Sequence, residues 1–245
     1  IFIVGMIRSG TTLLERMLSG HDEIGPLGEV SVVGRAIDTA IHEGQDLKPT
    51  IAGLAKRYEP YQNVAGDVRF TTDKMPNNYL YIGFLRQAFP DCKIILVKRD
   101  FRDIAVSAFE TYFDSPALNF SYTEAGILNR LKLFENMSSY WEAMGDICTV
   151  WYEDLVSEPE RVLQSVADYC GFELQPEMTQ PQRSTTAIRT ASHSQARQPL
   201  YASSQKRWQD DVCAQYLPSI VNDADNTSIA WRVAWLNDMQ RRSLA

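Results

Sequence analysis

The stretch IFIVGMIRSGTT, residues Ile1 to Thr12, decides which fold we expect for the rest of the chain. Four apolar residues run into Gly5, a second glycine follows at Gly10, and LLERMLSG then continues with apolar residues at helical spacing. The order is a strand, a glycine-containing loop and a helix. Such a loop lets backbone N–H groups and the positive end of a helix surround an anion, so it predicts a phosphate site.

The spacing from Gly5 to Gly10 fits the nucleotide triphosphatase frame G-x-x-x-x-G-K-[ST], but Thr11 stands where that frame has its lysine. Arg8 is the only cation inside the loop. Because the lysine that reaches the β- and γ-phosphates is missing, the loop suits a shorter anionic group than a magnesium-bound triphosphate. A plain strand-to-helix turn is the alternative interpretation.

Length and composition favour one soluble α/β domain over residues 1–245, since 44% of the residues are hydrophobic and 22% are charged. The formal net charge of −7 and the pI near 5.1 argue against nonspecific binding of nucleic acid, which requires a basic surface. An anionic small molecule must therefore be held by local cations.

Cysteine usage and hydropathy point to a reducing, cytoplasmic setting. The four cysteines are far apart and form no C-x-x-C pair, so neither a zinc site nor a disulfide framework is predicted. No stretch approaches the roughly 18 apolar residues that span a bilayer, and the start does not resemble a signal peptide. Because the chain begins inside its first strand and without methionine, we expect an excerpt from a longer protein.

Strand-like and helix-like segments alternate along the chain. We expect strands at 1–4, 69–74, 93–97 and 146–152, a loop at 21–30, and helices at 13–20, 30–42, 51–58, 79–89, 101–113, 123–144 and 159–170. This alternation predicts a P-loop-type three-layer α/β fold with a central parallel sheet flanked by helices. Ligands are then expected at the carboxyl ends of the strands.

The segment VKRDFRDIAVSAF contains a second candidate anion site. Arg99 directly follows the apolar strand at 93–97, and Ser107 lies eight residues later in the following helix. A guanidinium and a hydroxyl together make a good phosphate clamp. Alternatively, Arg99 forms a salt bridge with Asp100 or Asp103, and Ser107 is a small packing residue.

The combination of RSGTT after the first strand with RDxRDxxxS after a later strand resembles the sulfotransferases that use 3′-phosphoadenosine-5′-phosphosulfate (PAPS). The closest resemblance is to the tyrosylprotein sulfotransferases and their bacterial relatives. It implies in-line transfer of a sulfuryl group from PAPS to a hydroxyl acceptor, with the bisphosphate PAP as product and no metal. It also implies that the 5′-phosphosulfate is held by Arg8, Ser9, Gly10, Thr11 and Thr12, and the 3′-phosphate by Arg99 and Ser107.

The same resemblance implies the catalytic residues. Reading without gaps from Arg8, Glu29 falls on the family's catalytic base, which takes the proton of the acceptor hydroxyl. Lys74, in TDKMP, matches a lysine that stabilises charge on the transferring group. Tyr152, in WYEDLV, matches a tyrosine of the nucleotide site. The plain alternatives are a loop or N-cap glutamate at Glu29 and a half-buried aromatic residue at Tyr152.

A polar tract late in the chain resembles the family's loop over the nucleotide, which we place at 180–210. Ser192 matches a serine near the transferring group, and Arg207 before Trp208 stands where relatives have a lysine before tryptophan. The hydroxyls and cations of this tract suit a lid over phosphates. A surface loop rich in serine and glutamine is the alternative.

The sequence departs from the family at four positions. Ile7, Asp22 and Phe101 replace prolines that relatives commonly have beside the key motifs, which relaxes the backbone but removes no ligand. Thr111 replaces a basic residue, which predicts a weaker grip on the 3′-phosphate.

Several alternatives stay open at this point. The acceptor is a peptide or a small molecule, with a tyrosyl or other phenolic hydroxyl as the leading choice by analogy. Two other functions are a P-loop kinase that uses ATP and magnesium, and a noncatalytic nucleotide-binding module descended from a sulfotransferase. The segment with Trp231 and Trp235 is either part of the core or the surface of a homodimer.

Overall fold

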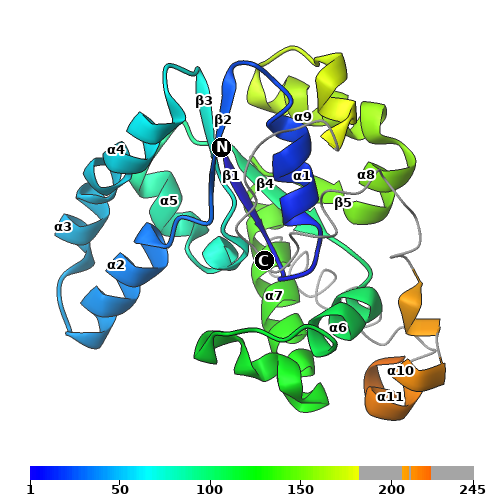
Figure 1. Cartoon of the computed structure of the whole chain (residues 1–245). Coiled ribbons are helices and arrows are strands. Elements are labelled where there is room, and N and C mark those ends of the chain that lie inside the picture. The colour runs from blue at the N-terminus through cyan, green and yellow to red at the C-terminus, as the bar shows by residue number, and fades with distance from the viewer. Residues whose placement is uncertain (182–205, 210, 222–245) are drawn as a thin grey trace, which may run out of the picture.

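The computed structural model describes residues 1–181, 206–209 and 211–221 (Figure 1). Its centre is a five-stranded parallel sheet with the strand order β2-β3-β1-β4-β5. The strands are β1 Phe2–Gly5, β2 Ile24–Gly28, β3 Phe70–Asp73, β4 Ile94–Lys98 and β5 Cys148–Trp151. The α/β fold with a parallel sheet, predicted from the alternation of segments, is confirmed.

The two central strands, β1 and β4, are buried along their whole length. They pair without a break from Phe2 opposite Ile94 to Gly5 opposite Val97. Continuous apolar runs are typical of parallel strands that have both faces covered by helices. These strands therefore form the rigid base from which the phosphate loop leaves the sheet.

Helices cover both faces of the sheet (Figure 1). Ile3 and Ile95 face a core with α1 (Thr11–Leu18), α8 (Tyr152–Ser157), α9 (Pro159–Cys170) and the short helix η3 (Pro176–Thr179). Val4 and Leu96 face the opposite core, because successive side chains of a strand alternate between faces. That core includes residues of α2 (Val32–His42), α4 (Leu54–Ala65), α5 (Ile82–Ala88), α6 (Phe101–Phe109), α7 (Glu124–Met144) and α11 (Pro218–Val221).

The remaining elements are short. They are α3 (Leu47–Ala52), α10 (Asp211–Tyr216) and the 3-10 helices η1 (Pro76–Leu80), η2 (Pro116–Tyr122) and η7 (Arg207–Gln209). Across the described residues, none of the helices combines the length and the apolar character that crossing a membrane requires. The four cysteines are free thiols.

The expected loop at 21–30 is wrong, because Ile24–Gly28 forms the edge strand β2. Pro26 and the glycines disfavour a strand in sequence reasoning, but an edge strand pairs on one side only and tolerates a proline. The pairing of β2 with β3 is irregular between Pro26 and Gly28, where the chain leaves the sheet. The helix expected at 51–58 is also wrong in its bounds, since α3 and α4 divide this region at Gly53.

Candidate functional site

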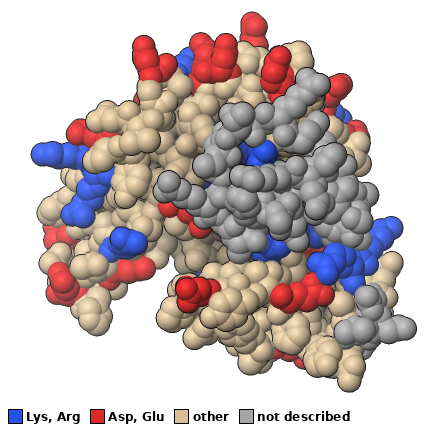
Figure 2. Space-filling model, viewed as in Figure 1, with Lys and Arg blue, Asp and Glu red and all other residues tan. Residues whose placement is uncertain are grey.

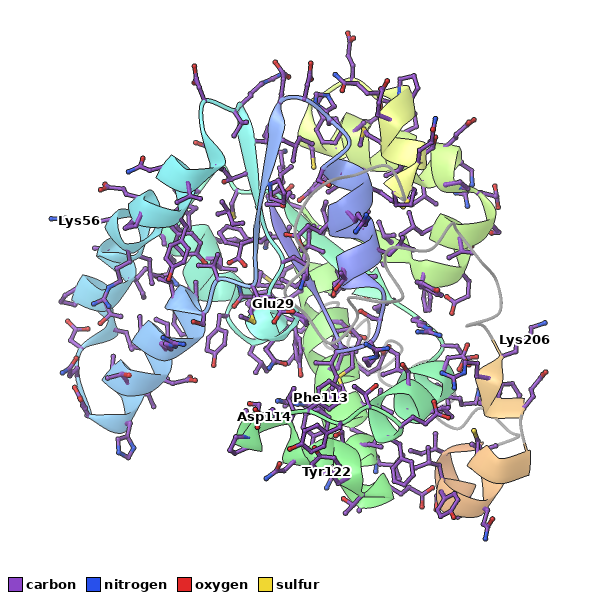
Figure 3. All side chains as sticks on the ribbon, in the orientation of Figure 1. Glu29, Lys56, Phe113, Asp114, Tyr122 and Lys206 are labelled. Atoms are coloured by element: carbon purple, nitrogen blue, oxygen red, sulfur yellow. The ribbon has the colours of Figure 1, made fainter. Side chains whose placement is uncertain are left out.

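The predicted site residues lie together where the five parallel strands end, at the carboxyl edge of the sheet. Glu29 directly follows β2, Lys74 follows β3, Arg99 follows β4 and Tyr152 follows β5, while Arg8 lies in the loop after β1. In Figure 3 the labelled Glu29 lies near the middle of the molecule, below the carboxyl end of β2.

The loop from Gly5 to Gly10, here called the phosphate loop, has a backbone that requires its second glycine. Gly10 has φ 102°, and a Cβ on this residue would overlap the ring of Tyr152. Arg8 also adopts a positive φ of 67°. Helix α1 begins at Thr11, so its positive end points into the loop. This backbone and the start of α1 are compatible with the predicted anion site.

The hydroxyls of this segment fit a bound anion. Ser9 is fully buried, and its Oγ has no hydrogen-bond partner within the described residues. Thr11 and Thr12, which begin α1, are also buried. A buried hydroxyl without a partner is uncommon in folded proteins, and a ligand oxygen would satisfy it.

Two arginines and a serine come together beside the phosphate loop. The Arg8 Nε donates to the Ser107 Oγ at 2.8 Å, and the Arg99 Nη1 donates to the Arg8 carbonyl oxygen at 2.9 Å. The Arg99 guanidinium also lies 4.4 Å from the centre of the Tyr152 ring. The structure thus unites residues that the sequence placed in separate motifs, and their charges favour an anion.

Of the two carboxylates considered as ion-pair partners of Arg99, Asp103 is one and Asp100 is not. Arg99 approaches Asp103 with an N–O distance of 3.9 Å, whereas Asp100 pairs with Arg102 at 2.6 Å. The buried Asp103 also accepts a hydrogen bond from the Lys206 backbone N–H at 2.8 Å. Sequence reasoning missed this second role of Asp103 as the anchor of a distant segment.

The described part of the late segment lies against α6. Arg207 pairs with Glu110 at 2.6 Å, and the Arg102 guanidinium stacks 3.7 Å from the centre of the Trp208 ring. Ser192 and residues 182–205 of the expected loop over the nucleotide lie outside the described residues, as do Trp231 and Trp235. Their roles stay predictions.

The four departures from the family pattern occupy defined places. Ile7 is buried in the core, and Phe101 packs against the same core. Asp22 exchanges two hydrogen bonds with Gln175, which hold the turn before β2. The Thr111 Oγ1 donates to the Ser107 carbonyl oxygen at 2.6 Å, so this position supplies a hydroxyl to the helix end.

Glu29 and Lys74 form an ion pair at the same end of the sheet, after the neighbouring strands β2 and β3. The Lys74 Nζ lies 2.5 Å from the Glu29 Oε1. Lys74 is completely buried, whereas the Glu29 side chain is 37% exposed. The N-cap of α2 is Ser31, so Glu29 is not the cap of that helix. The pair therefore joins a fixed buried cation to a carboxylate that solvent can reach.

Two further carboxylates lie close to this pair, and sequence reasoning missed both. Burial raises the pKa of Glu15, on α1, to about 7, and the positive charge of Lys74 acts in the opposite direction. Burial also raises the pKa of Asp73 to about 7, against the hydrogen bonds that it accepts from Tyr58 and Val30. The sequence signal for Glu15 was a pair of adjacent charged residues, Glu15 and Arg16, within the otherwise apolar helix LLERML.

Solved structures share this fold. The sulfotransferase domain of the Synechococcus PCC 7002 olefin synthase aligns with a TM-score of 0.61 at 18% identity and covers 91% of this chain and 92% of that one. The sulfotransferase domain from the curacin biosynthetic pathway aligns with a TM-score of 0.59 at 17% identity, over 85% of this chain and 89% of that one.

Curated sequences also match. An uncharacterized protein of Aquifex aeolicus (strain VF5) is 26% identical in an alignment of 228 residues that covers 85% of this chain and 30% of that protein. A Caenorhabditis briggsae protein named "Putative protein-tyrosine sulfotransferase" is 24% identical over 195 residues, covering 73% of this chain and 67% of that one. The chain thus spans less than a third of the length of the Aquifex protein.

The family model described as "Sulfotransferase family" matches residues 1–176. This range includes the phosphate loop, the Glu29–Lys74 pair, and Arg99 with its neighbour Ser107. The match covers well over half of the chain and every strand of its sheet. The chain therefore belongs to the sulfotransferase family.

Proposed function

We propose that this chain transfers a sulfuryl group from PAPS to a hydroxyl acceptor. The observation that carries the proposal is the pairing of buried Lys74 with exposed Glu29 at the same sheet edge as the phosphate loop. Strand β3 lies next to β1 in the sheet, so the ion pair and the anion site are neighbours. A base, a fixed cation and an anion site are the parts that such a transfer needs.

The donor would be held by the residues that the structure gathers beside the phosphate loop. When bound, PAPS supplies a sulfuryl group that is already activated by its phosphate leaving group. Arg8, Ser9, Gly10, Thr11 and Thr12 would hold the 5′-phosphosulfate, and Arg99 with Ser107 the 3′-phosphate, while Tyr152 packs against the loop. The unpartnered Ser9 hydroxyl and the paired arginines support this fit.

Glu29 would act as the base. Its carboxylate is accessible, so an acceptor hydroxyl can reach it and lose its proton there. Lys74 cannot follow the carboxylate into solvent, because its side chain is buried, and its charge stays where negative charge develops during transfer.

Figures 2 and 3 show the surroundings of this pair on one face of the molecule. Figure 2 shows a notch in this face between the side that carries α2 and the side that carries η2. In Figure 3, Glu29 lies above the segment with Phe113, Asp114 and Tyr122 on the lower side. Tyr122 closes that segment by hydrogen bonds to the Phe113 backbone, and Tyr112 beside it is 79% exposed. The match to a Caenorhabditis briggsae protein named "Putative protein-tyrosine sulfotransferase" supports a phenolic or tyrosyl acceptor.

The proposal is tested by label transfer. The protein is incubated with PAPS labelled in the sulfuryl group and with a panel of tyrosine peptides, simple phenols and sugars. We expect transfer to at least one phenolic hydroxyl, and its loss in Glu29→Ala and Lys74→Ala. Absence of transfer to every acceptor, with ATP and magnesium bound more tightly than PAP, would instead favour a kinase-like protein. Binding of PAP without any turnover would favour a noncatalytic module.

A further inference from the structure

The short segment from Gly28 to Val30, which carries Glu29, is fastened on both sides. The Gly28 N–H donates to the Glu15 Oε1 at 3.2 Å, and the Gly28 carbonyl oxygen accepts from the Lys74 N–H at 2.9 Å. The Val30 N–H donates to the Asp73 Oδ1 at 3.2 Å. Two carboxylates therefore hold the residues immediately before and after Glu29.

Both carboxylates are themselves anchored inside the protein. Glu15 is 9% exposed and also accepts from the Thr72 Oγ1 at 3.3 Å. Asp73 is 2% exposed, and its Oδ2 accepts from the Tyr58 hydroxyl at 2.6 Å and from the Asn78 amide at 3.2 Å. The segment is thus tied through these side chains to α1, β3, α4 and η1.

The backbone at this point needs such support. The pairing of β2 with β3 becomes irregular between Pro26 and Gly28, and Gly28 adopts a positive φ of 72°. Regular sheet hydrogen bonds therefore end where Glu29 begins. Buried carboxylates are a poor choice for stability alone, since apolar residues of similar size often stabilise a core as well or better. Their burial is explained if they serve the segment between them.

The contacts also link the two halves of the site. Helix α1 begins with Thr11 and Thr12 at the phosphate loop, and Glu15 lies one turn later on the same helix. Asp73 directly precedes Lys74, while its side chain holds the residue after Glu29. One helix and one strand end thereby fix the base relative to both the anion site and the buried lysine.

We infer that Glu15 and Asp73 are positioning residues, which hold residues 28–30 so that the Glu29 carboxylate stays against Lys74 for the transfer reaction. This inference rests on the proposed function, because it assigns Glu29 the role of base. A displacement of about 1 Å in a reacting group can cost on the order of 100-fold in rate, so a loosened segment should impair turnover.

The first experiment compares substitutions that keep or remove the acceptor oxygen. Glu15→Gln retains an oxygen for the Gly28 and Thr72 donors, whereas Glu15→Met has a similar volume and no such acceptor. We expect Glu15→Met to lower kcat by about 10- to 100-fold with the Kd for PAP changed less than about 2-fold, and Glu15→Gln to retain most of kcat. The acceptor is the compound of the label-transfer panel that turns over fastest. Asp73→Ala and Asp73→Asn form the second pair, in which asparagine restores the Val30 bond and rescues kcat in part.

The second experiment measures backbone amide exchange by NMR and needs no acceptor. Exchange of the Gly28 N–H should accelerate by about tenfold in Glu15→Met but not in Glu15→Gln, and that of Val30 should accelerate in Asp73→Ala. Amides of the central strand β4 should be unchanged, which separates local loosening from global loss of stability.

A third comparison tests whether the effect passes through Glu29. Adding Glu15→Met to Glu29→Gln should lower the residual turnover by less than about 2-fold, because the group being positioned is already gone. The inference is overturned if Glu15→Met and Asp73→Ala keep wild-type kcat, or if neither changes the exchange of its amide. Full activity of Glu29→Ala would instead refute the proposed base, whatever the exchange data show.

Discussion

Two buried lysines at the carboxyl ends of neighbouring parts of the sheet are alike in burial and in ion pairing, but their glutamate partners lie on different kinds of element. Lys74 follows β3 and lies 2.5 Å from Glu29, while Lys98 ends β4 and lies 2.6 Å from Glu142. Both lysine side chains are almost completely buried. Each forms one short ion pair with a glutamate at the carboxyl end of an apolar or β-branched strand, so neither burial nor the presence of an ion pair distinguishes them.

The difference lies in how each carboxylate is held. Glu142 belongs to the long helix α7, accepts a second hydrogen bond from the Thr149 Oγ1 at 2.8 Å, and has Glu135 of the same helix 4.0 Å from the Lys98 ammonium. Glu29 instead lies in a short segment between a strand and a helix and is the more exposed of the two partners. Lys98 ties α7 to the sheet, whereas Lys74 pairs with a partly exposed carboxylate in the segment between β2 and α2.

The largest expected effect is on turnover and separates the two lysines. Lys74→Met should lower kcat for sulfuryl transfer by about 100- to 1,000-fold, because it removes a fixed cation from the developing charge. Lys98→Met should leave kcat within about 3-fold of wild type, since its charge serves packing. Steady-state kinetics with labelled PAPS measures both. Equal losses in the two variants would show that Lys74 and Lys98 do not differ in their contribution to turnover.

A third cation, Arg99, extends the comparison to the nucleotide. Arg99→Ala should weaken binding of 3′,5′-adenosine bisphosphate by about 10- to 100-fold, the range for one charge-assisted hydrogen bond, and should change AMP binding little. Titration calorimetry with both nucleotides gives the ratio. Arg69→Ala, at an exposed arginine before β3, is the matched control. A uniform loss of affinity for both nucleotides would contradict a role at the 3′-phosphate.

For the free energy of unfolding, we expect the opposite ranking: Lys98→Met should destabilise the protein more than Lys74→Met. Lys98→Met leaves Glu142 without its cation in a half-buried position and should lower the free energy of unfolding by about 2 to 3 kcal/mol, less than a fully buried pair would lose. Lys74→Met should lower it by less, since the freed Glu29 carboxylate can turn to solvent. Urea denaturation of both variants checks the order. Greater destabilisation by Lys74→Met would show that Lys74, and not Lys98, contributes more to the stability of the fold.

The smallest effect is a pH dependence from the carboxylate beside Lys74. Because burial raises the pKa of Glu15 from 4.5 to about 7, the folded protein keeps this proton in a range where the unfolded chain releases it. The stability from this group is complete below about pH 4.5 and is lost as the pH rises through about 7. Glu15→Gln should therefore gain on the order of 1 to 2 kcal/mol over wild type between pH 5 and pH 8.

Denaturant titrations of wild type and Glu15→Gln at these two pH values measure the change. Glu173→Gln, at an exposed position, should run parallel to wild type. A stability difference between Glu15→Gln and wild type that stays constant with pH would mean that Glu15 does not titrate as a buried acid.

Much of the fold follows from local patterns along the chain. The apolar run at 93–97 could only be a strand with both faces covered, and Gly171 ends α9 in the left-handed conformation that favours glycine. The edge strand β2 could not be found in the same way. Its proline and glycines indicate a loop, and only its pairing with β3 stabilises it as a strand.

In the candidate site, too, local patterns predicted some features and the structure was needed for others. Arg8, Arg99 and Ser107 belong to motifs with fixed spacing, so the sequence alone identified them as candidates for holding an anion. Their mutual contacts depend on the order of β1 and β4 in the sheet, which no local pattern contains.

The sequence by itself determined the chemical groups of this protein: a glycine loop without the triphosphatase lysine, two arginines and a lysine after strands, and a glutamate at the position that the family resemblance implies for a base. Only the tertiary structure decided that Lys74 pairs with a carboxylate in a short loop segment while Lys98 pairs with one on the long helix α7, and that Glu15 and Asp73 hold the segment around Glu29. The physical reason is that burial and hydrogen-bond partners come from residues distant in sequence. Motif spacing along the chain identifies the candidate charged and hydroxyl side chains, whereas tertiary packing determines which of them are exposed.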